Sequence, residues 1–273
     1  MSTRPEIANS IKTGEFNTNY HDIGSGFPVI MLHGSGPGVS AWANWRTVMP
    51  ILSKTRRVIA PDMVGFGYSD RPEGTVYGMD VWVKQTIDLM DALDIKQADL
   101  VGNSFGGALA LALAIEQPER IRKIVLMGSM GVSFPITYGL DRGWGYTPSI
   151  ENMKELLGLF AYNRKIVTDE LVKLRYESSI QPGFQESFSS MFPAPRQDSV
   201  EKMAGYEIYL SSIKHEALIV HGRDDRVIPM ENSLKLIRTL ENAQLHIFGK
   251  CGHWTQLEKT ESFAKLVDNF LSE

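Results

Sequence analysis

Six short apolar runs, separated by segments of helical periodicity, constrain the fold of this chain more than any other feature. Each run leads into a Gly, Asp, Asn or His residue, where we expect a loop to begin. Continuously apolar strands that alternate with helices are typical of a parallel sheet covered by helices on both faces. The predicted strands are 29–32, 58–60, 98–101, 123–127, 217–220 and 245–248, and the predicted helices include 81–93, 105–116, 231–240 and 262–271.

The alternation stops between residues 134 and 209, where no strand is predicted. This segment is rich in aromatic and methionine side chains, and its stretches ENMKELLGLFAY and TDELVKLRY have the spacing of amphipathic helices. Packing within the segment explains most of these aromatic residues. A helical insertion over the carboxyl edge of a parallel sheet would also enclose the place where such folds bind ligands. We expect a core of residues 1–133 and 210–273 and a helical lid over 134–209.

Composition excludes several classes of protein. The net charge of −4 and the absence of a run of Lys and Arg argue against a nucleic-acid partner. The chain has no Cys/His cluster with zinc-ligand spacing, so no metal site is predicted. The longest apolar stretch, 106–115, is about half of the ~20 residues that span a bilayer. We therefore expect no membrane and no metal among the partners.

The cellular compartment is predicted from the cysteine content and the N-terminal sequence. The single cysteine, Cys251, allows no internal disulfide and fits a reducing compartment. The N-terminal sequence MSTRPEIANSIKTGEF lacks the apolar core of a signal peptide. We expect a cytoplasmic protein; a secreted protein whose signal has been removed is the alternative.

The stretch DLVGNSFGGALALALA predicts a nucleophilic serine. A predicted strand leads into Gly102-Asn103-Ser104-Phe105-Gly106 and then into a helix of small and apolar residues. This is the strand–turn–helix context of a G-x-S-x-G nucleophile elbow. Glycines on either side let strand and helix approach closely, while the strained turn exposes the serine hydroxyl at the helix N-terminus. We predict that Ser104 is the nucleophile.

A serine hydroxyl needs a general base, and the base needs an orienting acid. His253 follows the last predicted strand in a glycine-flanked loop, at the sheet edge where Ser104 is expected. The other histidines fit less well, since His21 and His215 lie in polar, loop-like segments, His246 lies within a strand, His221 ends one, and His33 is expected to shape a loop. We predict that His253 is the base.

The acid is expected between serine and histidine in the sequence. The stretch LIVHGRDDRVIP offers two neighbouring candidates, Asp224 and Asp225. In the pattern G-x-x-D-x-x-x-P, Gly222 and Pro229 select Asp225. Asp224 would then be a loop charge near an arginine.

The glycine-rich stretch HGSGPG follows the first predicted strand, and such a loop can bind phosphate or an oxyanion. It lacks the Lys-Ser/Thr of a P-loop, and Val39 stands where a dinucleotide fingerprint has its third glycine. The acidic residue that follows, Asp62, comes later than the ~20-residue spacing of a ribose ligand. Together with the elbow, the loop predicts an oxyanion hole formed by the backbone N–H groups of Ser35 and Phe105.

The segments HGSGPGVSAWANW, APDMVGFGYSDRP, LVGNSFGG, HGRDDRVIP and FGKCGHW together resemble the α/β-hydrolases of the meta-cleavage-product hydrolase family. The similarity covers essentially the whole chain, including the more specific lid segments WGYTPS, FAYNR, TDEL, LRYE and SFSSMFPAPRQ. It implies an α/β-hydrolase fold with a mostly parallel central sheet, helices on both faces and a helical lid after the sixth strand. It also implies hydrolysis of a carbon–carbon bond in a 2-hydroxy-6-oxo-2,4-dienoate, without cofactor or metal, by a homo-oligomer.

The resemblance also implies which residues bind the substrate. The polar end of the dienoate would meet Asn44, Asn103, Arg175 and Trp254. Arg175 offers a bidentate fork for a carboxylate, although a solvated charge on a helix surface would explain it as well. The opposite end would be lined by Phe160, Met130, Val200 and Ile228, and Met130 is expected to shrink the space for the acyl group.

Two other functions share the same three residues. A carboxylesterase would have Ser104, Asp225 and His253, but it would not need Arg175 and Asn44. A small-molecule receptor of this fold could also keep them, and only turnover separates it from an enzyme. Dehalogenases and epoxide hydrolases of this fold need an aspartate where this chain has Ser104.

Overall fold

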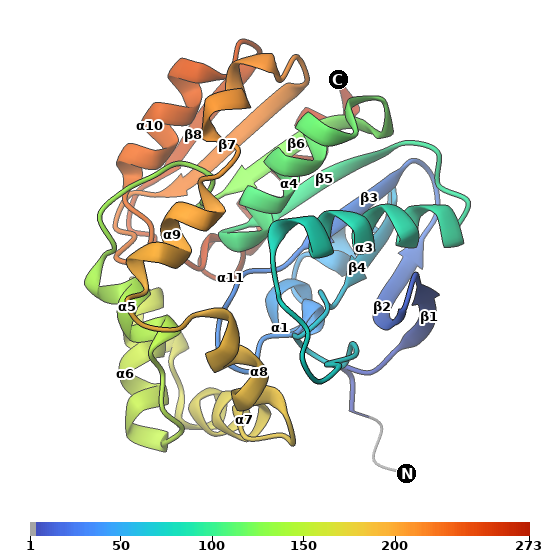
Figure 1. Ribbon diagram of the computed structural model, residues 1–273. Coiled ribbons are helices and arrows are strands. Elements are labelled where there is room, and N and C mark those ends of the chain that lie inside the picture. The colour runs from blue at the N-terminus through green and yellow to red at the C-terminus, as the bar shows by residue number, and fades with distance from the viewer. Residues whose placement is uncertain (1–3) are drawn as a thin grey trace.

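The computed structural model describes residues 4–273 and is built on an eight-stranded sheet (Figure 1). The strand order is β1-β2-β4-β3-β5-β6-β7-β8. The six strands from β4 to β8 in this order run parallel, while β1 and β2 form an antiparallel hairpin, and β2 pairs antiparallel with β4. The strands are β1 (Asn9–Thr13), β2 (Phe16–Gly24), β3 (Pro28–Leu32), β4 (Arg57–Pro61), β5 (Ala98–Asn103), β6 (Ile121–Met127), β7 (Glu216–Gly222) and β8 (Ala243–Phe248). The predicted mostly parallel sheet is confirmed.

Alternation of side chains along the central strands builds two cores, one on each face of the sheet. Ile30 and Leu32 of β3 belong to the core beneath α3 (Met79–Ala92), α4 (Phe105–Glu116) and α10 (Met230–Thr239). Val29 and Met31 belong to the core beneath α1 (Ala41–Trp45), α2 (Met49–Leu52) and α12 (Thr260–Ser272). Because helices cover both faces of the sheet, these strands are continuously apolar. This is why they could be predicted from the sequence.

The β1–β2 hairpin was not predicted, and the placement of His21 in a loop-like segment was wrong, because His21 lies in β2. The hairpin forms the edge of the sheet and is only partly buried, so its sequences NSIKT and FNTNYHDIG carry polar residues on both faces. The chain turns between the two strands at Gly14, whose φ is 58°. Edge strands of this kind lack the apolar run that marks a buried strand.

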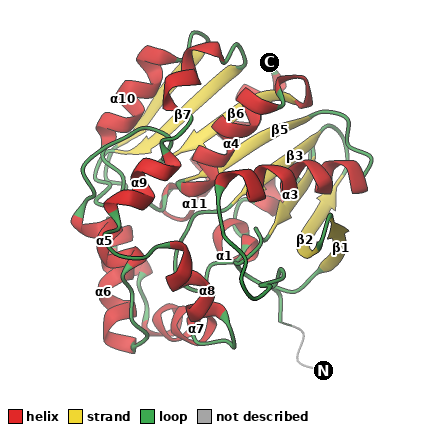
Figure 2. Ribbon diagram, viewed as in Figure 1, coloured by secondary structure: helices red, strands yellow, loops and turns green. Residues whose placement is uncertain are grey.

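The segment after β6 is helical, as expected, and contains no strand within residues 134–209. Three of its helices begin at a serine or threonine whose side chain accepts a backbone N–H, namely Thr137, Ser149 and Thr168. The helices are α5 (Tyr138–Trp144), α6 (Ile150–Phe160), α7 (Asp169–Ser179), α8 (Phe184–Met191) and α9 (Gln197–Met203). Figure 2 shows α5 to α8 grouped beside one end of the strands.

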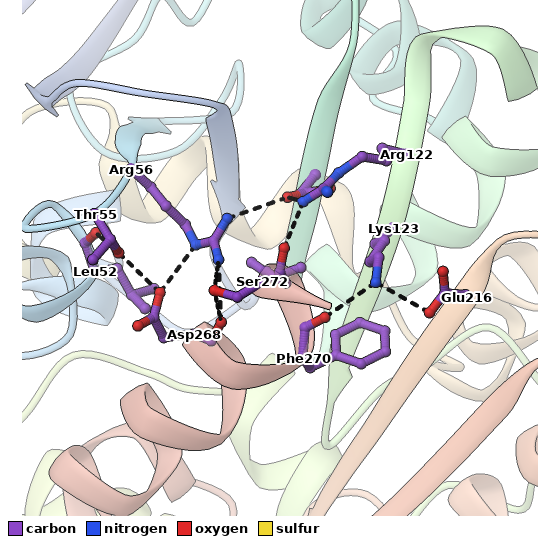
Figure 3. Close-up of polar contacts among 11 residues, drawn as sticks. Leu52, Thr55, Arg56, Arg122, Lys123, Glu216, Asp268, Phe270 and Ser272 are labelled. Atoms are coloured by element: carbon purple, nitrogen blue, oxygen red, sulfur yellow. Dashed lines mark hydrogen bonds and ion pairs between the residues drawn. The ribbon is translucent and has the colours of Figure 1, made fainter.

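The opposite end of the sheet is held by partly buried ion pairs (Figure 3). Asp99, near the start of β5, is fully buried and binds Arg122 of β6 through two hydrogen bonds of 2.8 and 2.6 Å. Arg56 contacts Asp99 at 4.0 Å and Asp268 of α12 at 3.2 Å. Lys123 donates to the carbonyl of Phe270 at 3.2 Å. These contacts fix the C-terminal helix against the amino ends of the strands.

Within residues 4–273, no helix is both long and apolar enough to cross a membrane.

Candidate active site

Ser104 occupies a strained turn between β5 and α4. Its backbone has φ 54° and ψ −111°, in a region that residues with a side chain rarely adopt. A Cβ atom at Gly102 would lie 2.2 Å from the carbonyl oxygen of Gly106, and one at Gly106 would lie 2.2 Å from the carbonyl oxygen of Leu32. The two glycines therefore permit the close approach of strand and helix that holds Ser104 in this conformation.

The turn is tied to the loop that follows β6. The Ser104 N–H donates to the Met127 carbonyl at 2.9 Å, and the Ser104 carbonyl accepts from the Met130 N–H at 3.1 Å. Gly128 lies between them with φ 51°, and a Cβ there would be only 3.2 Å from Nδ1 of His253. A glycine in this loop leaves room for the imidazole beside Ser104.

His253 and Asp225 are joined by a hydrogen bond of 2.8 Å between Nδ1 and Oδ2, with both side chains buried. The other carboxylate oxygen of Asp225 accepts the N–H groups of Val227 at 2.7 Å and Ile228 at 3.0 Å. Burial by itself raises the pKa of Asp225, but the His253 charge and hydrogen bond outweigh it and hold the pKa below its ordinary value. An ionised Asp225 makes Nδ1 of His253 the protonated nitrogen and leaves Nε2 free to accept a proton.

Asp224 points to a different neighbour. Its Oδ2 lies 3.4 Å from the backbone nitrogen of Cys251 and 3.5 Å from Arg223. The structure thus brings Asp225, and not Asp224, against His253. Ser104 and His253 line the same pocket, and within residues 4–273 no hydrogen bond yet joins the Ser104 hydroxyl to the imidazole. Such bonds are often long before substrate binds.

The backbone N–H groups of Ser35 and Phe105 make no hydrogen bond to any acceptor in the described part of the chain. Ser35 lines the pocket, and Phe105 is the first residue of α4, beside Ser104. Two free N–H groups next to a nucleophile are what an oxyanion hole requires. The side chain of Ser35 is held by Trp144 of α5, whose Nε1 donates to its hydroxyl at 3.0 Å.

His33 holds the loop after β3, where the oxyanion hole is predicted, against the segment after β4. Its Nε2 accepts the Met63 N–H at 3.0 Å, so its Nδ1 carries the proton and donates to the Gly34 carbonyl at 2.8 Å. Burial lowers the pKa of His33 to about 4, which keeps the ring neutral at pH 7. The expectation that His33 shapes the loop agrees with this position.

The sequence analysis considered Asp62 only as a ribose ligand and missed its structural role, which is to accept backbone hydrogen bonds from two separate segments. It is fully buried and accepts the N–H groups of Ala41 at 2.6 Å and Tyr68 at 2.7 Å. Burial raises its pKa to about 6. Its carboxylate thus connects the start of α1 to the segment after β4. The Asp-Met-Val-Gly-Phe-Gly run was a usable signal, because a carboxylate followed by glycines suits a turn.

The pocket around Ser104 contains about 450 Å³ of empty space, part of it open to solvent. Five of the eight predicted substrate-binding residues line it: Asn44, Asn103, Arg175, Trp254 and Phe160. Phe160, at the end of α6, also accepts the backbone N–H of His253 at 2.8 Å, and its ring lies 5.7 Å from the imidazole. The helical segment after β6 therefore contacts the loop that carries His253.

The three other predicted wall residues, Met130, Val200 and Ile228, do not line this pocket and are fully buried. The N–H of Met130 is bonded to Ser104, and its side chain packs into the core. Ile228 donates its N–H to Asp225, and its neighbour Val227 lines the pocket instead. As the pocket stands, Met130 does not limit its size. Apolar wall residues that the sequence did not reveal are Val39, Leu140, Trp144 and Val227.

Arg175 of α7 is buried in the wall of the pocket. Its Nη2 donates to the Pro37 carbonyl at 3.0 Å, and its Nε is buried without a hydrogen-bond partner among residues 4–273. In the same part of the chain, no carboxylate lies within 4.0 Å of its guanidinium. Burial, reinforced by the charge of Arg46, lowers the pKa of Arg175 to about 10, so it remains a cation at neutral pH. A solvated helix-surface charge is therefore the wrong description of this residue.

The described residues contain no group of three or more His, Cys, Asp or Glu side chains placed to hold a metal ion. The chemistry available in the pocket is that of a serine, an oriented imidazole, two free backbone N–H groups and a buried cation.

A strained serine between a strand and a helix, a histidine and an aspartate on later loops, and a mostly parallel sheet define the α/β-hydrolases. A family model described as alpha/beta hydrolase fold matches residues 28–260, and the chain belongs to this family. Within the family its similarity is to the meta-cleavage product hydrolases.

The relatives that carry this similarity cover almost the whole chain. A 2-hydroxymuconate semialdehyde hydrolase from Pseudomonas sp. (strain CF600) is 59% identical over 98% of this chain and 95% of its own. A 2-hydroxy-6-oxo-2,4-heptadienoate hydrolase from Pseudomonas putida is 57% identical over 98% of this chain and 97% of its own. A structure of a meta-cleavage product hydrolase from Pseudomonas fluorescens IP01, a serine-to-alanine variant with acetates, superposes with a TM-score of 0.97 at 56% identity, over 98% of this chain and 99% of that one.

Proposed function

We propose that this enzyme hydrolyses a carbon–carbon bond in 2-hydroxy-6-oxo-2,4-dienoates formed by meta-cleavage of catechols. The substrates are 2-hydroxymuconate semialdehyde or its 6-methyl analogue, and the products are 2-hydroxypenta-2,4-dienoate and a small carboxylic acid. Relatives named for these activities share 59% and 57% of their residues with the chain. The observation that carries the proposal is the buried Arg175 in the pocket of Ser104, which has no carboxylate within 4.0 Å among residues 4–273.

A buried guanidinium without a counter-charge is unfavourable unless a ligand supplies the charge. Arg175 has five N–H donors, and a carboxylate is the partner that can take two of them at once. Asn44 adds a second donor, because its Nδ2 is buried without a hydrogen-bond partner in the described residues 4–273, while its Oδ1 accepts the Gly34 N–H at 3.2 Å. An esterase that acts on neutral esters would have no use for this buried cation.

The proposed mechanism uses Ser104, His253 and Asp225 as a catalytic triad. The dienol first becomes a ketone, so that the departing carbon can leave as a stabilised carbanion. Nε2 of His253 takes a proton from Ser104, or from a water beside it, and the oxygen attacks the C6 carbonyl. The N–H groups of Ser35 and Phe105 stabilise the oxyanion. The C5–C6 bond then breaks, its electron pair is delocalised onto the C2 oxygen, which takes the proton from His253, and 2-hydroxypenta-2,4-dienoate departs from Arg175. Where Ser104 is the attacking group, His253 next activates a water that hydrolyses the acyl-serine and releases the small carboxylic acid.

The proposal includes the organisation of the chain. Residues 134–209 form the lid domain, and residues 1–133 and 210–273 form the core domain. The contact between Phe160 and His253 supports a lid that closes the pocket over the reacting bond. We further propose that the enzyme works in the cytoplasm as a homo-oligomer without cofactor or metal, and the single buried cysteine fits that compartment.

The proposal is tested by identifying the products. Incubation with 2-hydroxymuconate semialdehyde should give formate and 2-hydroxypenta-2,4-dienoate in equal amounts. Arg175→Gln should lower kcat/KM for this substrate roughly 100-fold, because a buried charge-assisted contact is lost. Arg238→Gln, an exposed arginine on α10, is the matched control and should retain full activity. Rapid hydrolysis of p-nitrophenyl acetate with an intact dienoate would identify an esterase instead.

A further inference from the structure

A second histidine lies behind the acid of the proposed triad. His221, near the carboxyl end of β7, is fully buried, and its Nε2 lies 3.6 Å from Oδ2 of Asp225. The same oxygen binds Nδ1 of His253, in the loop between β8 and α11 (Thr255–Glu258), at 2.8 Å. Oδ2 of Asp225 is therefore placed between two imidazoles, and only one of them belongs to the triad.

Side-chain alternation along β7 points His221 toward α10, which packs on β7 and β8 (Figure 1). Ile219, two residues earlier, belongs to the core beneath α10, while Val220 belongs to the core on the other face of the sheet. Ser233 of α10 meets the ring, with 2.7 Å between its Oγ and Nδ1 of His221. One edge of the imidazole thus faces α10, and the other edge faces the loop that follows β7.

The hydrogen bonds of His221 determine which of its nitrogens carries the proton. Nε2 faces the Ile228 carbonyl at 3.1 Å and the Asp225 carboxylate, and both of these groups are acceptors. Nε2 is therefore protonated, and Nδ1 accepts the Ser233 hydroxyl. Burial lowers the pKa of His221 and outweighs the charges of Asp225 and Glu231, so the ring is neutral at pH 7. A neutral ring thus holds a fixed N–H group toward Asp225.

His221 also holds the backbone that holds Asp225. The Ile228 carbonyl accepts from Nε2 of His221, and the Ile228 N–H donates to Oδ1 of Asp225 at 3.0 Å. One oxygen of the carboxylate therefore faces the ring N–H, and the other is bound by a residue that the ring anchors. Donors placed in this way keep a buried carboxylate ionised and fixed in orientation.

We infer that His221 is a positioning residue for the reaction, which acts through Asp225 and keeps its carboxylate aimed at His253. His221 does not line the pocket of Ser104, so it acts without touching the substrate. The inference rests on the triad of the proposed function. It does not depend on which bond the triad cleaves, because hydrolysis of an ester would use the same Asp225 and His253.

The test compares variants of His221 with and without the N–H donor. His221→Phe keeps a flat ring but removes the donor from both Asp225 and the Ile228 carbonyl. We expect kcat for 2-hydroxymuconate semialdehyde to fall at least about 10-fold, with KM within about threefold of the wild type. His221→Gln, whose amide can place an N–H at the same point, should recover most of kcat. His246→Gln, at an exposed histidine of β8, is the matched control and should behave like the wild type.

A double-mutant cycle separates positioning from a purely structural role. If His221 acts through Asp225, adding His221→Phe to Asp225→Asn should lower kcat by less than about threefold. The full loss in both backgrounds would overturn the inference. Wild-type kcat in His221→Phe, combined with unfolding at a lower urea concentration, would overturn it as well, since His221 would then only stabilise the fold.

Proton and nitrogen NMR of the histidine rings tests the inference without turnover. At pH 7, His221 should have Nε2 protonated and Nδ1 unprotonated; the opposite tautomer would overturn the inference even if no His221 variant folds. The proton on Nδ1 of His253 should resonate at a different frequency in His221→Phe and at an unchanged one in His246→Gln. An unchanged frequency in His221→Phe would contradict the coupling.

The proposed reaction can fail separately from this inference. If the wild type leaves the dienoate intact but hydrolyses p-nitrophenyl acetate, the proposed reaction falls, and the same comparison of kcat among the His221 variants is made with the ester. If the wild type turns over neither compound, the NMR comparison of His221→Phe with His246→Gln decides whether His221 acts on the pair formed by Asp225 and His253.

Discussion

Nδ1 of His253 lies 2.8 Å from Oδ2 of Asp225, while Oδ1 of the same carboxylate accepts two backbone N–H groups. This arrangement fixes both the orientation of the carboxylate and the position of the proton on His253. Asp225→Asn should therefore present an amide N–H or a weaker acceptor to the imidazole and favour the wrong tautomer. We expect kcat for the dienoate to fall about 10⁴-fold, as the same change does in other Ser-His-Asp enzymes.

Asp224→Asn is the matched control for this prediction. Asp224 contacts the Cys251 backbone at 3.4 Å and Arg223 at 3.5 Å, so kcat should stay within about threefold of the wild type. Steady-state kinetics of both variants decide the matter. A large loss in Asp224→Asn with little loss in Asp225→Asn would reverse the assignment of the acid.

The turn at Ser104 should not tolerate a side chain at Gly106. In Gly106→Ala the new Cβ would lie 2.2 Å from the Leu32 carbonyl and 2.7 Å from the His33 carbonyl, so strand and helix must separate. We expect a loss of roughly 3 kcal/mol or more in the free energy of unfolding, measured in urea, together with loss of turnover.

Gly249→Ala provides a matched control, because the nearest atom to its Cβ would be Arg223 Nη1 at 3.5 Å. This variant should unfold within about 0.5 kcal/mol of the wild type. Equal stability of the two alanine variants would show that the close approach at Gly106 does not limit the turn.

The low pKa of His33 predicts a pH-dependent part of the stability. Burial lowers the pKa from 6.5 to about 4, so between these values the unfolded chain binds a proton that the folded chain does not. The free energy of unfolding therefore rises with pH, and this contribution is lost as the pH falls from 6.5 to about 4. It amounts to about 3 kcal/mol.

His33→Gln removes this titration and keeps a donor and an acceptor. The difference in unfolding free energy between the wild type and His33→Gln should shrink by about 3 kcal/mol when urea titrations are moved from pH 7 to pH 4. A difference that is independent of pH would mean that His33 titrates alike in the folded and unfolded states.

Arg122 should stabilise the fold without affecting the chemistry. It binds the fully buried Asp99 through two hydrogen bonds, and without it only Arg56, at 4.0 Å, would oppose that charge. Arg122→Gln should cost about 2–3 kcal/mol of unfolding free energy, less than a fully buried pair because the Arg122 side chain is 33% exposed. Its kcat/KM at 25 °C should equal that of the wild type, since the contact lies at the opposite end of the sheet. Reduced turnover with unchanged stability would contradict this.

The sequence predicted the elements whose pattern depends on burial alone. The strand around Val101 is apolar because helices cover both faces of the sheet, and the elbow at Ser104 is marked by glycines that the turn requires. The β1–β2 hairpin could not be found in this way. It is an edge pair, so polar residues occupy faces that are buried in a central strand.

Within the site, the order of Ser104, Asp225 and His253 could be predicted because each follows a strand at one edge of the sheet. The residues that line the wall of the pocket could not be predicted in this way. Met130 also follows a strand, but a hydrogen bond to the Ser104 carbonyl commits its backbone to the elbow and its side chain to the core. The lack of a counter-charge at Arg175 could not be predicted either, since it depends on which carboxylates the folded residues 4–273 leave more than 4.0 Å away.

The central claim is that Ser104 catalyses cleavage of a dienoate, and the bleaching of yellow 2-hydroxymuconate semialdehyde tests it most directly. The absorbance is followed after addition of the wild type or of Ser104→Ala. We predict rapid bleaching by the wild type and a rate at least about 10⁴-fold lower for Ser104→Ala. Colour that persists with the wild type, while p-nitrophenyl acetate is hydrolysed, would contradict the account.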